Sequence, residues 1–259
     1  MQIPFIKMQA QGNDFVILNL LGHQEADFDA ARLAKDICDR RFGVGADGLV
    51  LLLDSEIAAA KMQIFNSDGS RALMCGSALR CISRLLKELS GITEAEIATD
   101  AGIRPILIEN NTVQVSLGKP FIVSPMIVVE GINGCLVNVG NHHFVCFDLP
   151  LEDDPHLHYG PVFERHPDLP SAVNTHFVRV ISSEEIEIKI WERGVGATFA
   201  CGTGAAACVL CGMEKGILKK RVTVNMPGGA VSIQYLESGE CVLGGEVSET
   251  FSGAYQWKI

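Results

Sequence analysis

Two cysteines in this sequence stand at glycine-bearing turns that open apolar segments with helical spacing. Met74-Cys75-Gly76-Ser77 leads into a helix expected over residues 75–89, and Ala200-Cys201-Gly202-Thr203-Gly204 leads into one expected over residues 201–215. The first turn of a helix has N–H groups without partners and lies at the positive end of the helix dipole. A thiol placed there has a lowered pKa, and the adjoining N–H groups bind anions such as a carboxylate.

Two such turns acting on one substrate suit a reaction that inverts a stereocentre. One thiolate removes the proton next to a carboxylate, the second thiol returns a proton to the opposite face, and the helix N–H groups hold the developing charge. This chemistry requires neither a metal nor pyridoxal. A lone Cys-Gly turn is more often a buried cap, but two matched turns favour Cys75 and Cys201 as an acid–base pair.

The other cysteines are predicted to be small buried hydrophobic residues. Cys81 and Cys208 lie about two turns into the same helices, and Cys208-Val209-Leu210-Cys211 is the only Cys-x-x-Cys pair in the sequence. No second pair and no histidine at ligand spacing accompany it, so the sequence predicts no zinc site. The remaining members of this group are Cys38, Cys135, Cys146 and Cys241.

Composition and charge restrict the class of protein. The chain has 259 residues, of which 47% are hydrophobic and 20% are charged, so it is long and apolar enough to fold around a sizeable core. Its net charge of -10 leaves no basic surplus to neutralise phosphates, which argues against nucleic-acid binding. No secretory signal and no run of about 18 apolar residues is present, so we expect a cytoplasmic protein that does not insert in a membrane.

The pattern of strands and helices indicates a mixed α/β chain with two similar halves. A further helix is expected over Asp27–Arg41, and the likeness of Arg41-Phe42-Gly43-Val44-Gly45-Ala46 to Glu192-Arg193-Gly194-Val195-Gly196-Ala197 suggests an internal duplication. Gly118-Lys119-Pro120 marks the expected boundary. Strands are expected at residues 15–18, 49–53, 61–65, 95–99, 106–108, 112–117, 126–129, 144–147, 176–181, 185–191, 221–225, 230–235 and 240–243.

In order and spacing, the sequence resembles the diaminopimelate epimerase family over nearly the whole chain. The resemblance is carried by Gly12-Asn13-Asp14-Phe15, Gly43-Val44-Gly45-Ala46-Asp47-Gly48, Asp68-Gly69-Ser70, Met74-Cys75-Gly76, Arg80-Cys81, Gly140-Asn141 with His143, Asn174 with Phe177-Val178, Glu192-Arg193-Gly194, Ala200-Cys201-Gly202-Thr203-Gly204-Ala205 and Pro227-Gly228-Gly229. It implies an α+β fold of two pseudo-symmetric domains, each a β-barrel-like sheet wrapped around a central α-helix, with the active site in the cleft. The implied domains are residues 1–118, joined by a C-terminal strand returning at about 248–259, and residues 119–247.

Family membership implies a cofactor-independent isomerase that converts LL-2,6-diaminopimelate to meso-diaminopimelate and feeds lysine and peptidoglycan synthesis. The partner is then a small amino-acid substrate, and the family suggests a homodimer. The resemblance implies that Cys75 and Cys201 are the acid–base pair. It assigns the carboxylate at the reacting carbon to backbone N–H groups of Gly76, Ser77, Gly202 and Thr203.

The resemblance also assigns the remaining substrate contacts. Asn13, His143 and Glu192 are implied near the reacting carbon and its amino group, whereas the distal amino-acid end is implied to contact Asn66, Asn141, Asn174 and Arg193. A planar guanidinium suits a carboxylate there. From spacing alone, Asn141 and Asn174 could equally form turns, His143 could be a strand histidine, and Glu192 with Arg193 could be a surface pair of little energetic worth.

The first cysteine turn departs from the family pattern. Cys75-Gly76-Ser77-Ala78 stands where Cys-Gly-Asn-Gly is usual, and the Cβ of Ala78 would disfavour a positive φ there. Arg71, His142 and Ala197 also differ from the residues usual at their positions. We therefore expect weaker discrimination against other amino acids, because a lost polar contact also removes a penalty against wrong ligands.

Three other functions fit parts of the sequence. A racemase of glutamate, aspartate or proline on the same fold shares the two-thiol chemistry, although Glu192-Arg193-Gly194 and Ala200-Cys201 favour the diaminopimelate type over the proline type. A catalytically inactive amino-acid-binding protein is supported only by the Ser77-Ala78 change. Thiol redox work could use a disulfide between Cys75 and Cys201, which should inactivate the enzyme, or the Cys208/Cys211 pair, which lacks the exposed helix start that such pairs favour.

Overall fold

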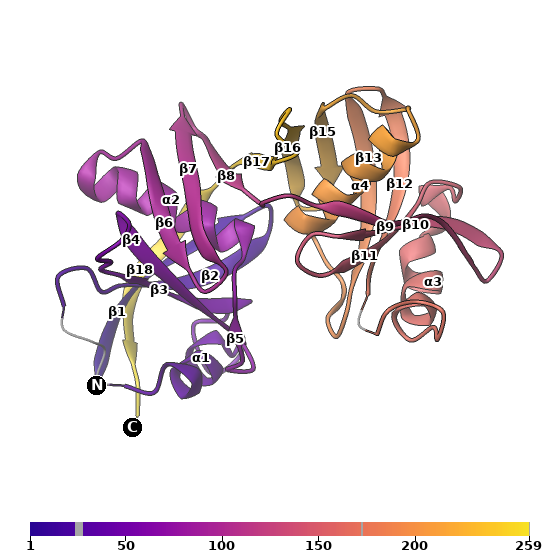
Figure 1. Cartoon of the computed structure of the whole chain (residues 1–259). Coiled ribbons are helices and arrows are strands. Elements are labelled where there is room, and N and C mark those ends of the chain that lie inside the picture. Colours follow the sequence, from indigo (N-terminus) through magenta and orange to yellow (C-terminus); the bar gives the residue numbers. More distant parts are fainter. Residues whose placement is uncertain (24–27, 172, 259) are drawn as a thin grey trace. The chain divides into compact units, whose positions relative to one another are not determined.

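The computed structural model describes residues 1–23, 28–171 and 173–258, which form two compact units. Unit 1 contains Met1–Val115 and the returning segment from Gly245 onward, and unit 2 contains Ser116–Gly244. The sequence placed this division at 118/119 and the returning strand at about 248. Both ends of the chain lie in unit 1, where Met1 N donates to Trp257 O at 2.7 Å (Figure 1).

Unit 1 is a mixed sheet with two helices, α1 (Ala30–Cys38) and α2 (Gly76–Ser90). Its described strands are β1 (Gln2–Ala10), β2 (Asn13–Asn19), β3 (Gly48–Leu53), β4 (Ala60–Asn66), β5 (Arg71–Ala72), β6 (Glu94–Thr99), β7 (Gly102–Glu109), β8 (Thr112–Ser116) and β18 (Ser248–Gln256). They lie in the order β18-β1-β2-β3-β4-β6-β7-β8, and the short β5 pairs with the end of β4. The pairs β2–β3 and β4–β6 are parallel, and the others are antiparallel.

Unit 2 is a second mixed sheet, with the helices α3 (Pro155–Glu164) and α4 (Gly202–Glu214) and the 3-10 turn η1 (Leu151–Asp153). Its described strands are β9 (Phe121–Val129), β10 (Ile132–Asn138), β11 (His142–Cys146), β12 (Asn174–Ser182), β13 (Glu185–Glu192), β14 (Gly196–Ala197), β15 (Arg221–Met226), β16 (Gly229–Tyr235) and β17 (Cys241–Glu246). They lie in the order β9-β10-β11-β12-β13-β15-β16-β17, with β14 on the end of β13. The parallel pairs are β11–β12 and β13–β15.

The two units repeat one topology. Each sheet has its parallel pairs at the same two places, a short extra strand before the cysteine helix, and a peripheral helix before the third strand of the repeat. In this alignment α1 matches α3, α2 matches α4, and β18 matches β9 as the outermost strand. The internal duplication suggested by the sequence therefore extends to the whole strand order.

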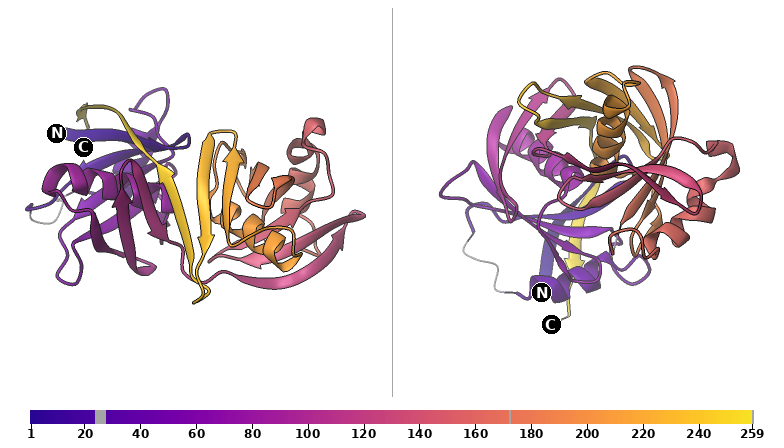
Figure 2. Two further views of the ribbon diagram at one scale, coloured as in Figure 1. Left: turned by 90° about the horizontal axis from the view of Figure 1, so that it is seen from above. Right: turned by 45° about the vertical axis from the view of Figure 1, so that its right-hand side comes forward.

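The cysteine helices lie against the concave side of each sheet. α4 contacts β9, β10, β11, β12 and β16, and α2 contacts β1, β2, β4 and β7. A helix that contacts strands from distant parts of one sheet is enclosed by that sheet, as the two views in Figure 2 also show. The predicted α+β fold of two pseudo-symmetric units, each a sheet around a central helix, is confirmed.

The helix expected over Asp27–Arg41 is shorter in the structure, at Ala30–Cys38. Asp29 caps its first turn by accepting a backbone N–H at 3.0 Å. After the helix, the Asp39 carboxylate accepts hydrogen bonds from the backbone N–H groups of Arg41 and Phe42, each at 2.7 Å. These bonds form a turn that ends the helix. The predicted start, Asp27, lies outside the described residues.

No helix was predicted at Pro155–Glu164, where the structure has α3. Pro161 inside the segment and the weak apolar periodicity both argue against a helix. Pro155 occupies the first helical turn, a position that proline favours, and packing against β12 and β13 holds the segment. Tertiary contacts thus override a poor local pattern.

A disulfide joins Cys135 of β10 to Cys211 of α4. Both residues were predicted to be ordinary core cysteines, and this pairing corrects that prediction. The two cysteines are 76 residues apart and approach only because α4 lies on the sheet. The bond ties the central helix of unit 2 to its sheet.

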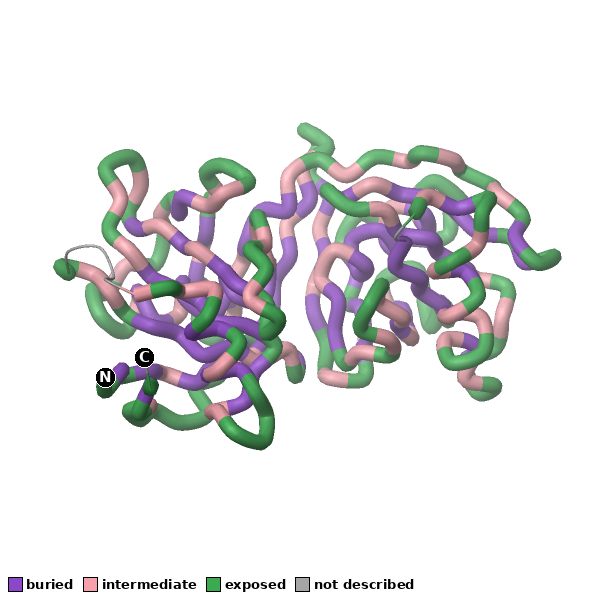
Figure 3. Tube along the Cα trace, turned by 90° about the horizontal axis from the view of Figure 1, so that it is seen from below, coloured by how far each residue is buried: buried purple, intermediate pink, exposed green. Residues whose placement is uncertain are grey.

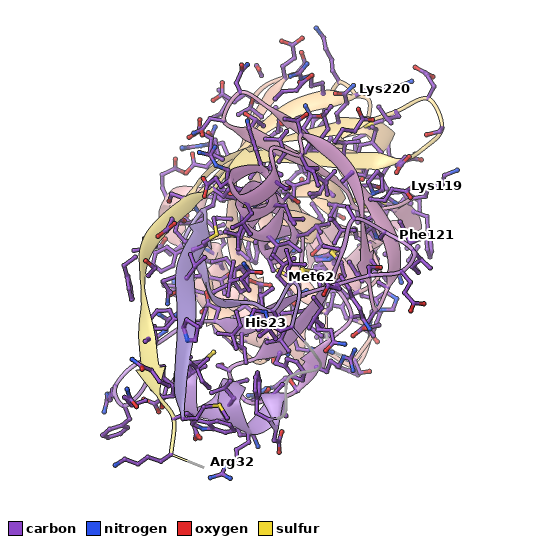
Figure 4. The ribbon with its side chains drawn as sticks, turned by 90° about the vertical axis from the view of Figure 1, so that its left-hand side faces the viewer. His23, Arg32, Met62, Lys119, Phe121 and Lys220 are labelled. Carbon is purple, nitrogen blue, oxygen red and sulfur yellow. A yellow bond between two sulfur atoms is a disulfide. The ribbon has the colours of Figure 1, made fainter. Side chains whose placement is uncertain are left out.

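Burial is concentrated in the inner strands and the central helices, whereas the turns and the outermost strands β18 and β9 are largely exposed (Figure 3). In unit 1, Met62 of β4 is 1% exposed and lies inside the sheet (Figure 4). Arg32 of α1, on the surface in the same view, places its guanidinium carbon 5.6 Å from the centre of the Trp257 ring. Trp257 also donates from Nε1 to Asp36 at 2.7 Å, so α1 holds the returning segment in unit 1.

Candidate active site

Cys75 is the N-cap residue of α2 in unit 1. Its backbone is extended (φ -141°, ψ 122°), and its carbonyl accepts the first helical hydrogen bond from Leu79 N at 2.9 Å. The N–H groups of Gly76 and Ser77 precede that bond and therefore have no acceptor within the helix. The half-buried thiol thus lies at the positive end of α2, beside N–H groups that an anion can use.

Asn13 is the asparagine that lies beside this thiol. It begins β2 and donates from Nδ2 to Cys75 Sγ at 3.9 Å. The preceding turn has positive φ at both Gln11 (52°) and Gly12 (83°), which directs the chain sharply back from β1. Asn66, at the exposed end of β4, instead donates to Ser70 Oγ at 2.9 Å.

A charge cluster holds the segment that carries Asn13. Asp14 Oδ2 lies 2.6 Å from Lys7 Nζ, and Asp14 Oδ1 lies 2.7 Å from Arg40 Nη2, which also pairs with Asp47 at 2.8 Å. Burial alone would raise the pKa of Asp14, but hydrogen bonds from Arg40 and Lys7 outweigh it and lower that pKa to about 2. Asp14 is therefore ionised in the folded protein and anchors the loop that precedes β3.

Arg80 is a buried cation that the sequence analysis did not assign to the site. It lies one turn into α2 and is 1% exposed. Its guanidinium donates to two neutral oxygens, Glu246 O at 3.4 Å and Ser77 Oγ at 3.5 Å. Burial lowers the pKa of Arg80, and the thiols of Cys81 and Cys75 oppose that shift. Because a guanidinium remains charged in proteins, its field favours the thiolate form of Cys75.

The residues that depart from the family pattern in this turn are inside α2. Ser77 is 5% exposed and directs its hydroxyl towards Arg80, so it offers a ligand its N–H group. Ala78 is fully buried in the helix and has no positive φ, so the strain expected from its Cβ does not arise. Arg71 pairs with Asp100 (Nε–Oδ2 2.5 Å) on the surface of unit 1.

Cys201 is the matching N-cap residue of α4 in unit 2, with φ -142° and ψ 102°. Its thiol lies 3.6 Å from Thr203 Oγ1, and its carbonyl accepts from Ala205 N at 2.9 Å. Burial, followed by the charge of Glu192, raises the pKa of Cys201 well above its ordinary value, although the Thr203 hydroxyl and the Gly204 N–H oppose the shift. Cys201 is therefore a protonated thiol in this structure, in contrast to the lowered pKa predicted from helix position alone.

The turn that carries Glu192 and Arg193 is held by α3 and β12. Asn174 accepts Arg193 N–H on its Oδ1 at 2.9 Å, and Glu192 Oε1 accepts from Thr198 Oγ1 at 2.6 Å. Glu164, the last residue of α3, accepts from Trp191 Nε1 at 2.7 Å and from Gly194 N at 3.0 Å. The helix that the sequence did not predict thus fixes both sides of this turn.

His143 lies in a hydrogen-bonded chain inside unit 2. Its Nδ1 is 2.8 Å from His176 Nε2, and its Nε2 is 2.9 Å from Asn141 Oδ1. Both imidazoles are fully buried. Burial lowers the pKa of His143 and lowers that of His176 to about 3, so both rings are neutral. With both ring nitrogens occupied, His143 supports Asn141, the exposed end of this chain.

His143, His176 and Cys201 also place one ligand atom each within 4.8 Å of one another. Two histidines and a cysteine form a set that zinc accepts. The two imidazoles already share a hydrogen bond, however, and the group lies at the positive end of α4, which disfavours a cation. The hydrogen-bonded chain is the simpler explanation of this proximity.

The predicted site residues therefore fall into two groups. Unit 1 brings together Cys75, Asn13, Gly76 and Ser77, with Asn66 at the end of β4. Unit 2 brings together Cys201, Gly202, Thr203 and Glu192 around the start of α4, with Asn174 and Arg193 in the adjoining turn and Asn141 joined to His143. Arg80 completes the first group and His176 the second, and neither was predicted as a site residue. For Arg80 the sequence offers a signal, because it is a single arginine on an otherwise apolar helix face.

Comparison with known proteins assigns this pair of sites to a family. The family model described as "Diaminopimelate epimerase" matches residues 5–123 and 135–249. This chain belongs to the diaminopimelate epimerase family. It is 42% identical over 272 residues to the diaminopimelate epimerase of Carboxydothermus hydrogenoformans, with 98% of this chain and 99% of that protein covered. It is 40% identical over 276 residues to that of Desulforudis audaxviator, with the same coverage.

Solved structures with the same fold extend beyond this family. A hydroxyproline epimerase from Agrobacterium vitis with bound trans-4-OH-L-proline has a TM-score of 0.70 at 15% identity, with 98% of this chain and 92% of that chain covered. A phenazine biosynthesis protein of the PhzF family from Bacillus anthracis has a TM-score of 0.75 at 15% identity, with 98% and 99% covered. At this identity the likeness shows the fold alone.

Family membership makes the chain an isomerase of the epimerase class. The predicted family and enzyme class are thereby confirmed. Among the helices of the described residues, none combines the length and the apolar composition needed to cross a membrane.

Proposed function

We propose that this enzyme epimerises LL-2,6-diaminopimelate to meso-diaminopimelate with Cys75 and Cys201 as its two acid–base groups. The observation that carries the proposal is the equivalence of the two thiols. Each is the N-cap of the central helix in its own copy of a duplicated fold. A reaction that treats two faces of one carbon alike calls for two such groups, and the family of this chain supplies the substrate.

The two thiols are electrostatically unequal, and this inequality supports distinct resting roles. Arg80 favours a thiolate at Cys75, whereas burial and Glu192 favour a thiol at Cys201. In the proposed step, the Cys75 thiolate takes the proton from the Cα–H bond, and the electron pair of that bond remains on the carbon. Cys201 then gives its S–H proton to the opposite face and becomes the thiolate. Protons and electrons balance without an oxidant.

The substrate contacts follow from the groups available in each unit. The first-turn N–H groups of Gly76, Ser77, Gly202 and Thr203 would hold the carboxylate at the reacting carbon and stabilise the carbanion. Asn13 and Glu192 lie beside the two thiols and would bind the amino group there. The distal end would be bound by Asn66, Asn141, Asn174 and Arg193, with His143 acting through Asn141.

The test is an assay of the purified enzyme without added cofactor, following solvent deuterium into the α position of LL- and meso-diaminopimelate. Cys75→Ala and Cys201→Ala are each expected to lose epimerisation by at least about 10³-fold, because each removes one of two essential acid–base groups. Cys81→Ala and Cys208→Ala, buried in the same two helices, serve as matched controls and should retain turnover. Epimerisation that survives either N-cap substitution would contradict the two-thiol proposal.

Substrate range is part of the same proposal. We keep the expectation of relaxed specificity at the first turn, although Ser77 is buried and Ala78 is unstrained. Glutamate, aspartate and proline should be assayed beside diaminopimelate, since a racemase of one of them is the alternative. Selectivity equal to that of a relative with Cys-Gly-Asn-Gly at this turn would argue against relaxed specificity. The proposed roles in lysine and peptidoglycan synthesis and the proposed homodimer require separate measurements, by genetic complementation and by sedimentation.

A further inference from the structure

His176 is a buried histidine that the proposed mechanism does not use directly. It lies on β12, is fully buried, and its ring packs against the first turn of α4, where a Cβ on Gly204 would stand 2.1 Å from its Cε1. Its Nε2 is 2.8 Å from His143 Nδ1. His143 Nε2 in turn is 2.9 Å from Asn141 Oδ1, so three side chains form one continuous chain from the core to the surface.

The donor and the acceptor of each hydrogen bond in this His176–His143–Asn141 series follow from the number of protons on the two rings. Within the described residues, His176 Nδ1 has no hydrogen-bond partner. If His176 donated from Nε2, the unpartnered Nδ1 would carry only a lone pair. If His176 accepted at Nε2, Nδ1 would carry a buried N–H without an acceptor. Orphaned buried N–H groups are rarer and more costly than under-used acceptors, so His176 donates to His143.

This direction determines the hydrogen bond from His143 to Asn141 and the group that Asn141 offers to a ligand. His143 uses Nδ1 as its acceptor, so its single proton is on Nε2, which donates to Asn141 Oδ1 at 2.9 Å. The amide oxygen of Asn141 is then occupied inside unit 2. What remains for a ligand is the amide NH₂ group, a donor. The reversed chain would present the oxygen instead, an acceptor.

We propose that His176 is a positioning residue that fixes the polarity of Asn141, so that this amide offers a hydrogen-bond donor to a substrate carboxylate and not an acceptor to a substrate ammonium. This inference rests on the proposed function, because it deepens the contact of Asn141 with the distal end of the amino-acid substrate. It adds a specificity determinant that lies in the core and touches no substrate atom.

The chain can be measured directly in the folded wild-type enzyme by ¹⁵N NMR of its histidines. We expect His143 to be protonated at Nε2 alone at neutral pH, and a scalar coupling across the hydrogen bond between His176 Nε2–H and His143 Nδ1. A proton on His143 Nδ1, or a doubly protonated His143, would overturn the inference. Because this readout needs no turnover, it is independent of whether diaminopimelate is the substrate.

Kinetics of three variants test the consequence for binding. His176→Gln keeps an amide donor and should hold KM for diaminopimelate within about threefold of wild type. His176→Glu supplies an acceptor, reverses the chain and should raise KM about tenfold or more, with kcat affected less. His176→Leu, which removes the donor without adding a buried charge, should give an intermediate KM if the glutamate variant does not fold.

The matched control is Thr175→Val, a buried change on the same strand. Equal KM values for the glutamine, leucine and glutamate variants would refute a positioning role for His176. A wild-type enzyme that does not turn over diaminopimelate would instead refute the proposed function. The NMR result would then still decide the direction of the hydrogen bonds from His176 to Asn141.

Discussion

Replacing Gly204 with alanine tests the packing of α4 on His176. Gly204 is the third residue of the helix, and a Cβ there would lie 2.1 Å from Cε1, 2.5 Å from Nε2 and 2.7 Å from Nδ1 of the His176 ring. All three distances are below van der Waals contact. The ring is rigid, and its Nε2 is held by His143 at 2.8 Å, so it has little freedom to move.

The sign of the effect depends on two opposing contributions. In an unconstrained helix, alanine is favoured over glycine by about 1 kcal/mol. Overpacking a filled core costs about 1–3 kcal/mol. Because the clash at Gly204 is with a ring edge and not with a flexible chain, we expect the second contribution to win and Gly204→Ala to destabilise unit 2 by about 1–2 kcal/mol. For a unit of about 130 residues each kcal/mol lowers the melting temperature by about 4 °C.

The measurement uses the two tryptophans of the chain, which lie in different units. In a Trp257→Phe background, the fluorescence of Trp191 reports the thermal or urea-induced unfolding of unit 2. Ala78, at the equivalent position of α2, provides the matched control: Ala78→Gly should destabilise unit 1 through lost helix propensity and the loss of a buried methyl group, as reported by Trp257 in a Trp191→Phe background. Removing the ring with His176→Ala should abolish most of the penalty of Gly204→Ala. A Gly204→Ala protein as stable as wild type would refute the described packing.

Three further predictions concern charge and thiols. Arg80→Met should raise the pH at which iodoacetamide alkylates Cys75, because a nearby cation is lost, whereas Arg80→Lys should shift it less. Asp14 has a folded-state pKa of about 2 against an ordinary 3.8, so its stabilising effect is complete above that ordinary value and is lost as pH falls towards 2. Urea unfolding at pH 6 and pH 3 should therefore show a smaller acid destabilisation in Asp14→Asn. Thiol titration of the unfolded protein without reductant should count seven thiols, and nine after reduction of the Cys135–Cys211 disulfide.

The parts of the site that depend on local sequence were predictable. Cys75 and Cys201 each precede glycine and an apolar helical stretch, and the helices begin one residue after them. Capping and glycine punctuation act over a few residues, so one sequence contains the whole signal. The same holds for the duplicated topology, whose strands and turns repeat along the chain.

The parts that depend on contacts between distant segments were not predictable. His176 meets His143 only because β11 and β12 pair in parallel, with His143 opposite Asn174. The raised pKa of Cys201 reflects burial that the helix position alone does not reveal. In each case the deciding quantity is a register or a degree of burial that spacing along the chain does not encode.

The strand β18 has a consequence for biosynthesis. Unit 2 has its outermost strand, β9, directly before β10, whereas unit 1 takes β18 from beyond the whole of unit 2. On the ribosome, unit 2 can therefore acquire all its strands while β1 still has one side unpaired. The first half to be translated is the last to be completed, and a chain that stops before Ser248 would leave the backbone N–H and C=O groups of β1 open to pairing with other nascent chains.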